Sequence, residues 1–283
     1  MIRLIATDMD GTLLTGSKTY GIPPENAAAI REAQAAGIVV ALASGRMSDD
    51  AGFYAVDAGL SLPVIGLNGG TIAMEPLGEI IYSRPMAEAD ARALTAEAIR
   101  SGMLFALFGA KRLWVSRDDR TLDHIWGGYI GREGSDTQIT AGEENLEILF
   151  RAGVHKLVIV DETGGGRLPA LRERCLRAVP GCSITSSWRD NIEINPSGVD
   201  KGTALRALAE HLHIPMDEVM AMGDNDNDIA MLTAAGCGVA MSNASPAALR
   251  AAEWVSLPCA DFGAAAAIRA LALGLPQEGV RRL

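Results

Sequence analysis

Two clusters of acidic residues carry much of the chemistry that this sequence could perform. Asp8 and Asp10 stand in Asp-Met-Asp-Gly-Thr at the end of the apolar run 2–7. Asp224 and Asp228 stand in a Gly-Asp-Asn-Asp-Asn-Asp run that follows another apolar stretch. Carboxylates this close repel one another, so a bound cation is expected, and an aspartate at such a place can act as a nucleophile. Taken singly, each cluster is also typical of an ordinary turn or helix cap.

Two further segments could bind an anion. Ser44-Gly45-Arg46 follows the apolar run 38–43, and its small residues would let backbone N–H groups approach a phosphate while the hydroxyl adds a donor. Lys201 begins a predicted helix, where the helix dipole disfavours a cation. That position indicates another task, such as pairing with a phosphate. A plain turn and a solvated surface lysine are the alternatives for these two segments.

The elements that must position these residues alternate between strand and helix. Apolar runs at 2–7, 38–43 and 63–67 are separated by helical segments at 24–36 and 48–59. The same alternation returns near the end of the chain, with predicted strands at 191–195, 218–223, 238–241 and 254–257. This pattern predicts a parallel sheet with helical crossovers. Each of the four chemical segments follows a predicted strand, so all four should meet at the carboxyl edge of that sheet, where ligands bind.

The middle of the chain has a different pattern. Two strands and a helix occur roughly twice between residues 84 and 189, which predicts an α+β unit, with helices that include 118–129. The polar stretch 131–147 gives no clear assignment. The sequence therefore predicts an α/β fold with a Rossmann-like parallel-sheet core, built from 1–83 and 190–283, and an inserted α+β domain at 84–189.

Composition excludes several classes of protein. The 283 residues are 48% hydrophobic, which is enough for a sizeable core, and the net charge is −10. An acidic chain is a poor non-specific binder of nucleic acid and of anionic membranes. No run reaches the roughly 18 apolar residues of a membrane span, and the first residues do not form a signal peptide. We therefore expect a soluble cytoplasmic protein with no nucleic-acid or membrane partner; nothing in the sequence specifies an oligomeric state.

Taken together and in this order, the four segments resemble the haloacid dehalogenase-like (HAD) phosphohydrolase superfamily, most closely its Cof-type branch with a large α+β cap (type IIB). The resemblance covers the whole predicted core, whereas the cap matches in length and order alone. Ser44 stands where many relatives have Thr. The matching segments are Asp8-Met9-Asp10-Gly11-Thr12-Leu13, Ser44-Gly45-Arg46, Asn68-Gly69-Gly70, Lys201-Gly202 and Gly223-Asp224-Asn225-Asp226-Asn227-Asp228.

This resemblance implies a Mg²⁺-dependent phosphatase that acts on a small phosphomonoester, such as a sugar phosphate. Asp8 would be the nucleophile that forms an aspartyl-phosphate, and Asp10 the general acid and then the general base. Mg²⁺ would be held by the carboxylates of Asp8 and Asp224 and the backbone carbonyl of Asp10, with Asp228 orienting these ligands. Contacts to phosphate would come from Met9, Ser44, Gly45, Arg46, Lys201 and Asn227.

Three other functions share parts of this pattern. A phosphomutase on the same core would carry the same four segments and return the phosphoryl group to substrate. A non-catalytic phospho-acceptor or binding domain is disfavoured by Asp10, because a stable acyl-phosphate is better kept away from an acid/base group. Haloacid dehalogenation would leave the Mg²⁺-binding carboxylates without a purpose.

Several other reactive side chains are expected to be structural. We expect the histidines to be surface or packing residues, Lys156 to be a charge at a strand edge, and the pair Trp188 and Arg189 to be exposed. The four histidines are His124, His155, His211 and His213.

Overall fold

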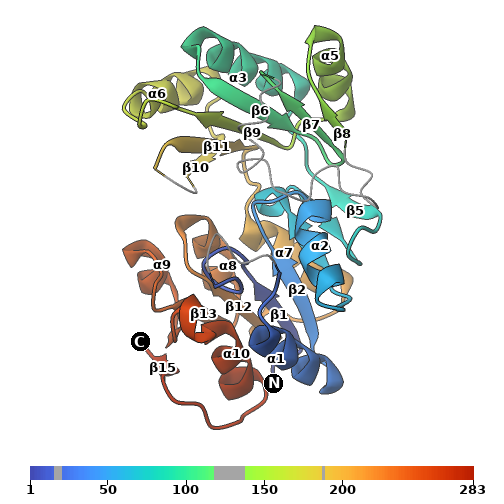
Figure 1. The fold of residues 1–283 in the computed structure, drawn as a ribbon, viewed down its shortest axis with the longest axis vertical. Helices are drawn as coiled ribbons and strands as arrows, with labels where there is room; N and C mark the ends of the chain where they lie inside the picture. Colours follow the sequence, from blue (N-terminus) through green and yellow to red (C-terminus); the bar gives the residue numbers. More distant parts are fainter. Residues whose placement is uncertain (16–20, 118–137, 187–188) are drawn as a thin grey trace. The chain divides into compact units, whose positions relative to one another are not determined.

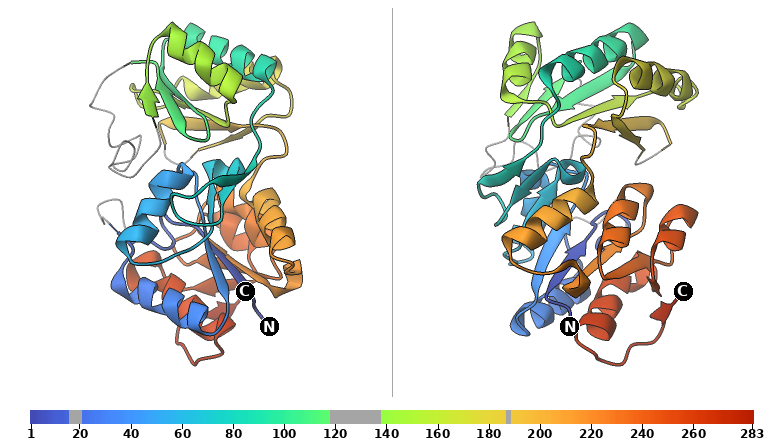
Figure 2. Two further views of the ribbon diagram at one scale, coloured as in Figure 1. Left: turned by 90° about the vertical axis from the view of Figure 1, so that its right-hand side faces the viewer. Right: turned by 180° about the vertical axis from the view of Figure 1, so that it is seen from behind.

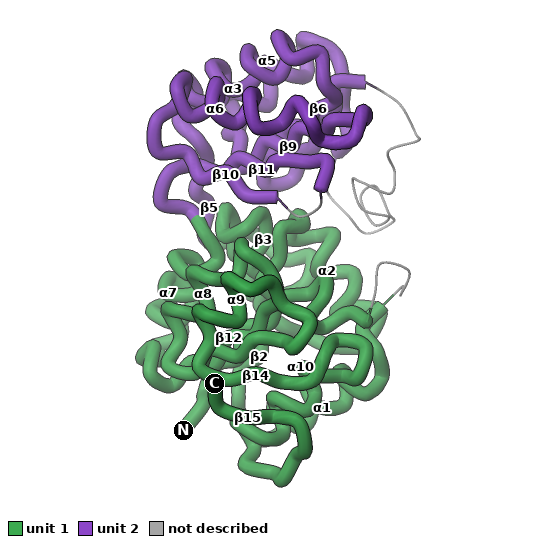
Figure 3. Tube along the Cα trace, turned by 90° about the vertical axis from the view of Figure 1, so that its left-hand side faces the viewer, with its two compact units in different colours: residues 1–81, 200–283 green, residues 82–199 purple. Residues whose placement is uncertain are grey.

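The structure is a computed structural model of the 283-residue chain, and it describes residues 1–15, 21–117, 138–186 and 189–283. The described residues form two compact units (Figure 3). Unit 1 combines residues 1–81 and 200–283, and unit 2 comprises residues 82–199.

Unit 1 is built on a nine-stranded sheet with the order β15-β14-β13-β12-β1-β2-β3-β4-β5 (Figure 1). Its middle strands run parallel, and they are buried because their sequences are almost entirely apolar. The parallel strands are β1 (Leu4–Thr7), β2 (Val39–Ala43), β3 (Val64–Gly66), β12 (Val219–Gly223), β13 (Cys237–Met241) and β14 (Trp254–Ser256). The remaining strands are β4 (Thr71–Ala73), β5 (Ile80–Ser83) and β15 (Arg281–Arg282).

Helices cover both faces of this sheet (Figure 2). On one side α1 packs against α10, and on the other α7 packs against α8 and α8 against α9. These helices are α1 (Pro24–Ala35), α2 (Ser48–Asp57), α7 (Lys201–His211), α8 (Ile229–Ala234), α9 (Pro246–Ala251) and α10 (Gly263–Ala267). A π-helical turn at Ile268–Ala272 continues α10, and short 3₁₀ turns occur at Leu67–Gly69, Met216–Glu218, Asp226–Asp228 and Cys259–Asp261. The parallel α/β core predicted from the sequence is confirmed.

The described residues of unit 2 form a six-stranded sheet with helices on one face (Figure 1). Alternate strand residues such as Phe105, Leu107 and Ile159 join residues of α3, α5 and α6 in one apolar core. The strands are β6 (Leu104–Phe108), β7 (Arg112–Val115), β8 (Gln138–Thr140), β9 (Lys156–Val160), β10 (Ser183–Thr185) and β11 (Asn191–Asn195), and the helices are α3 (Glu88–Ser101), α5 (Glu143–Ala152) and α6 (Leu168–Ala178).

The strand at Asn191–Asn195 lies in a different sheet from the one expected. It forms β11 of unit 2 and pairs antiparallel with β9 and β10, so the chain returns to unit 1 at Asp200 and not at residue 190. An apolar alternation identifies a strand but not its partners. Here Ile192 and Ile194 face the apolar core of unit 2, and this burial decides the pairing.

Other local expectations meet mixed outcomes. The unassigned stretch contains β8 and the start of α5, an amphipathic helix with Leu149 and Phe150 buried. The helix expected at 118–129 lies outside the described residues, as do His124 and Trp188.

Lys156 is not a strand-edge charge. It lies buried on β9 inside the sheet, with its ammonium 3.2 Å from Glu193 and 4.9 Å from the centre of the Phe108 ring. Of the remaining histidines, His211 and His213 are exposed, and His155 is a buried packing residue.

Buried His155 should make the stability of unit 2 depend on pH. Its Nε2 lies 2.7 Å from Ser83 Oγ, and burial lowers the pKa of its imidazole from 6.5 to about 4, outweighing a backbone contact with Gly153. Below pH 6.5 the imidazole of His155 binds a proton in the unfolded chain but stays neutral in the folded chain. The free energy of unfolding therefore falls as the pH drops toward 4. From pH 7.5 to pH 5 this group should cost about 2 kcal/mol.

Urea unfolding of the wild-type chain and of His155→Gln at these two pH values tests this dependence. We expect the difference between the two pH values to shrink by about 2 kcal/mol in the variant, whereas His211→Gln, at an exposed site, should behave as wild type. An unchanged difference in His155→Gln would show that His155 is not the responsible group.

None of the helices formed by the described residues is long and apolar enough to cross a bilayer.

Candidate active site

Asp8 lies at the carboxyl end of the central strand β1, between β12 and β2. Its backbone N–H donates to the carbonyl of Met222 at 2.9 Å, and its side chain is buried. The chain then turns tightly around the carbonyl of Met9, which accepts from the N–H groups of Thr12, Leu13 and Leu14. Met9 itself is fully buried.

Glycine is required in this turn. Gly11 has a φ of +91°, and a Cβ there would come within 2.4 Å of the Asp224 carboxylate. Both the left-handed backbone and the close approach exclude a larger side chain. The first loop is thereby packed directly against the loop that follows β12.

Asp224 and Asp228 belong to that second loop. Thr12 Oγ1 donates to Asp224 Oδ1 at 2.9 Å, which fixes one oxygen of this carboxylate. Both oxygens of Asp228 have hydrogen-bond donors: Oδ2 accepts from the backbone N–H groups of Asp224 and Asn225, each at 2.9 Å, and Oδ1 accepts from Lys201 Nζ at 2.6 Å. Asp228 therefore organises the loop rather than presenting a free oxygen.

Lys201 connects the loop after β1 with the loop after β12. It is the first residue of α7, whose start is fixed by a capping box in which Asp200 accepts from the N–H of Thr203 and Thr203 Oγ1 accepts from the N–H of Asp200. Its side chain is fully buried, and Nζ lies 2.5 Å from Asp8 Oδ1 and 2.6 Å from Asp228 Oδ1. The ammonium thus aligns the candidate nucleophile.

The charge of this cluster favours a divalent cation. Oxygens of Asp8, Asp224 and Asp228 lie within 4.8 Å of one another, and Lys201 supplies one positive charge against three carboxylates. Burial and the charge of Asp228 raise the pKa of Asp8, and the same two causes raise that of Asp224 to about 6. Burial alone would lower the pKa of Lys201, but Asp228 and Asp8 raise it, so the lysine stays charged. Hard carboxylate oxygens with excess negative charge are the ligands that Mg²⁺ and Ca²⁺ prefer.

Ser44, Gly45 and Asn227 are brought together through Asn68. Asn68 is buried in a left-handed conformation (φ 56°), and its N–H donates to the carbonyl of Ser44 at 3.0 Å. Its Oδ1 accepts from Asn227 Nδ2 at 3.1 Å, and a Cβ on Gly45 would lie 3.0 Å from the same oxygen. Asn tolerates the left-handed region better than most non-glycine residues, because its short polar side chain can form local hydrogen bonds.

Arg46 contacts two carboxylates in this structure. Its Nε and Nη2 donate to the two oxygens of Asp10 at 2.8 and 2.9 Å, and its Nη1 donates to Asp50 at 3.0 Å. The guanidinium lies 5.1 Å from the centre of the Tyr54 ring. Asp10 and Arg46 thus form a separate ion pair and are not part of the buried cluster around Lys201.

The structure also reveals site residues to which the sequence gave no role. Besides Thr12 and Asn68, Asn243 Nδ2 donates to the carbonyl of Gly11 at 2.9 Å, and the N–H of Ser245 donates to the carbonyl of Asp224 at 2.8 Å. Both follow β13, so the rule that sites form at the carboxyl ends of strands could have found them. Asp226, beside the cluster, accepts from Ser245 Oγ at 2.6 Å.

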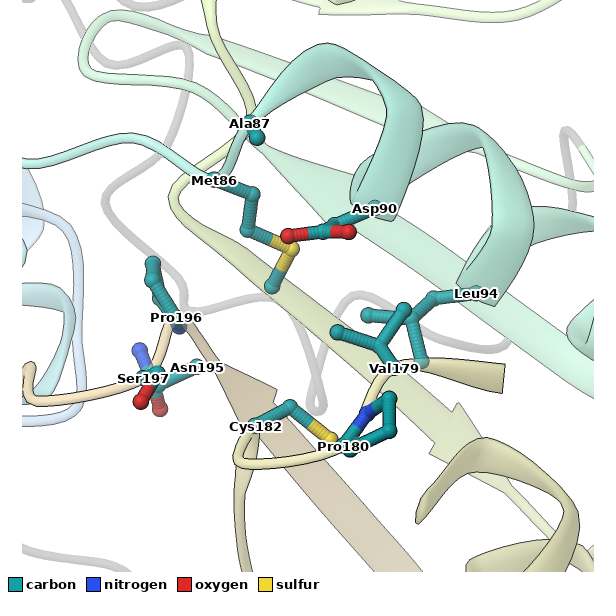
Figure 4. Close-up of a pocket in the computed structure, with 10 residues that line it drawn as sticks. All are labelled: Met86, Ala87, Asp90, Leu94, Val179, Pro180, Cys182, Asn195, Pro196 and Ser197. Atoms are coloured by element: carbon teal, nitrogen blue, oxygen red, sulfur yellow. The ribbon is translucent and has the colours of Figure 1, made fainter. Parts of the chain in front are cut away.

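A cavity in unit 2 is too small to be a substrate site. Its volume is about 60 Å³, enough for a few water molecules, whereas pockets for organic ligands have about 300–1,000 Å³. It lies where α3 begins (Figure 4), and its lining residues are Met86, Ala87, Asp90, Leu94, Val179, Pro180, Cys182, Asn195, Pro196 and Ser197.

Comparison with known proteins identifies the family. Residues 5–268 match the model of the haloacid dehalogenase-like hydrolases. The chain is 33% identical over 270 residues to the 5-amino-6-(5-phospho-D-ribitylamino)uracil phosphatase YcsE of Bacillus subtilis, covering 95% of each protein. A haloacid dehalogenase-like hydrolase from B. subtilis has a TM-score of 0.82 and 27% identity, covering 95% of this chain and 100% of that one. A HAD subclass IIB sugar phosphatase shares the fold, with a TM-score of 0.78 and 21% identity over 96% of this chain and 99% of that one. The chain therefore belongs to the haloacid dehalogenase-like hydrolase family, and the family and phosphatase class predicted from its sequence are confirmed.

Proposed function

We propose that this hydrolase is a Mg²⁺-dependent phosphatase that cleaves a small phosphomonoester through an aspartyl-phosphate on Asp8. The observation that carries this proposal is the contact of the buried Lys201 ammonium with Asp8 at the end of β1, beside Asp224. A carboxylate held in this way is directed for attack, while the neighbouring charges can balance those of a phosphoryl group.

The donor set fits Mg²⁺. Both oxygens of Asp228 accept hydrogen bonds from the protein, so the carboxylates of Asp8 and Asp224 would hold the ion. The family resemblance adds the backbone carbonyl of Asp10 as a further ligand. Mg²⁺ supplies charge neutralisation for the phosphoryl oxygens when it is bound. It also accounts for phosphate binding by a net-acidic protein.

The reaction requires two proton transfers. An oxygen of Asp8 attacks phosphorus, the bond from phosphorus to the ester oxygen breaks, and Asp10 gives a proton to the leaving oxygen. Asp10 then removes a proton from a water molecule, which attacks the same phosphorus and releases inorganic phosphate and the Asp8 carboxylate. The phosphoryl oxygens would be contacted throughout by Lys201, Ser44, Gly45, Asn227 and the backbone of Met9.

The leaving group would be a small polar molecule. The relative from B. subtilis is named for the phosphate ester of a ribityl-substituted uracil, in which the phosphate sits on a polyol chain. We infer that esters of this kind, or sugar phosphates, are substrates, with unit 1 as the catalytic core and unit 2 as the cap that selects the leaving group.

Metal removal tests this proposal. We expect excess EDTA to abolish hydrolysis of p-nitrophenyl phosphate and Mg²⁺ to restore it fully, because the carboxylates of Asp8 and Asp224 repel each other and the substrate without the ion. Release of free phosphate, assayed as a function of added Mg²⁺, is the measurement. A rate that EDTA does not change would refute the metal site, and transfer of phosphate to a second sugar without its release would indicate a phosphomutase.

A further inference from the structure

Arg46 uses its guanidinium to bridge two carboxylates that have different surroundings. Nε and Nη2 form a two-point contact with Asp10, at 2.8 and 2.9 Å, and Nη1 reaches Asp50 at 3.0 Å. This fork-to-fork geometry fixes the plane of the Asp10 carboxylate as well as its position. A lysine in the same place could supply the charge but not the orientation.

The two ends of this bridge differ in their exposure to solvent. Asp50 lies on α2 with its side chain 3% exposed, four residues from Arg46, and the Tyr54 ring on the same helix is also buried. The Asp10 side chain is 53% exposed. Because the packed helix holds Asp50, the fixed end of the bridge is at α2, and the end that Arg46 restrains is Asp10.

We propose that Arg46 is a positioning residue for Asp10, held in place by Asp50, and not a ligand of the transferred phosphate. This inference rests on the proposed function, in which Asp10 protonates the leaving oxygen. Three of the guanidinium N–H directions point to carboxylates in this structure. The proposed function already assigns the contacts to phosphate to Lys201 and to the turns at Ser44 and Asn227. An exposed carboxylate without this restraint would sample many rotamers, so correct alignment with the leaving oxygen would become rare.

A positioning role and a phosphate-binding role predict different kinetics. The value of kcat/KM reports the steps up to release of the leaving group. An alkyl phosphate such as glycerol 2-phosphate needs a proton from Asp10 in that step, while p-nitrophenolate leaves unprotonated. Loss of Asp10 alignment should therefore affect only the alkyl ester, whereas loss of a phosphate contact should affect both esters and weaken inhibition by inorganic phosphate.

The test compares Arg46→Gln, Arg46→Lys and Asp50→Asn in the full chain with Mg²⁺. For Arg46→Gln we expect kcat/KM on glycerol 2-phosphate to fall about 100-fold, and on p-nitrophenyl phosphate less than threefold. Arg46→Lys should recover little of this loss, because it lacks the fork, and Asp50→Asn should give a smaller loss with the same selectivity. Arg269→Gln is the matched control: it removes a two-point contact with Glu32 on α1 and should leave both esters unaffected.

The outcomes separate this inference from the proposed function. An equal fall for both esters, together with a higher inhibition constant for inorganic phosphate, would identify Arg46 as a phosphate ligand and overturn the inference. Unchanged kinetics in Arg46→Gln would overturn it as well. Absence of Mg²⁺-dependent hydrolysis in the wild-type chain would instead refute the proposed function. Thermal unfolding of each variant verifies that the compared proteins are folded.

Discussion

Replacing Asp8 by Asn should lower kcat for p-nitrophenyl phosphate by about 10⁴-fold or more, because an amide cannot form the acyl-phosphate. The fold should be retained or slightly stabilised. Burial and the nearby charge of Asp228 raise the pKa of Asp8. The ionised Asp8 carboxylate is therefore electrostatically unfavourable in the free protein. A neutral side chain of the same shape removes this repulsion, and Lys201 keeps its contact with Asp228.

Phosphate release and thermal unfolding of the same preparation are the two measurements. Asp217→Asn, at an exposed position beyond the site, serves as the control and should match wild type in both. Appreciable turnover by a well-folded Asp8→Asn protein, for example a tenth of the wild-type rate, would remove Asp8 from the nucleophile role. Unfolding of the Asp8→Asn protein would show that Asp8 is needed for folding. This result would contradict our expectation, drawn from the raised pKa of Asp8, that a neutral side chain is tolerated at this position.

Replacing Lys201 by Met should reduce both stability and activity. The variant leaves Asp8, Asp224 and Asp228 close together without their ammonium partner, and breaking a buried ion pair in this way typically costs about 3–5 kcal/mol. The pKa of Asp224 is already about 6, so ionisation of this cluster opposes folding increasingly as the pH rises toward 6. The loss in Lys201→Met should therefore be greatest at neutral and alkaline pH and smaller near pH 5.

A double variant separates the two effects of Lys201. Adding Asp228→Asn to Lys201→Met removes one of the repelling charges, while the side-chain carbonyl can still accept from the N–H groups of Asp224 and Asn225. We expect urea unfolding to show that stability is partly restored while phosphate release stays low. Full recovery of activity in the double variant would mean that Lys201 acts only as a structural counter-ion, contrary to a role with the phosphoryl group.

Several parts of the site could be predicted because they depend on local sequence. Asp8, Ser44 and Asp224 each follow an apolar run, and parallel strands place their carboxyl ends at one edge. The start of α7, and hence the position of Lys201, follows from the pairing of Asp200 and Thr203. In each case one short segment contains both the element and its boundary.

Other features required contacts between distant parts of the chain. The family resemblance assigned Arg46 to phosphate. Its contact with Asp50 is local, four residues along the chain, but its contact with Asp10 spans 36 residues and depends on the tertiary fold. In the same way, Asn68 meets Asn227 across 159 residues. The amino-acid sequence alone determined the strands and helices of the parallel core and the reactive side chains that follow them, because hydrophobic periodicity and helix capping act within a few residues. Tertiary structure alone decided that Asn191–Asn195 joins the second sheet and that Arg46 faces carboxylates, because strand pairing and ion pairing depend on which surfaces are buried together.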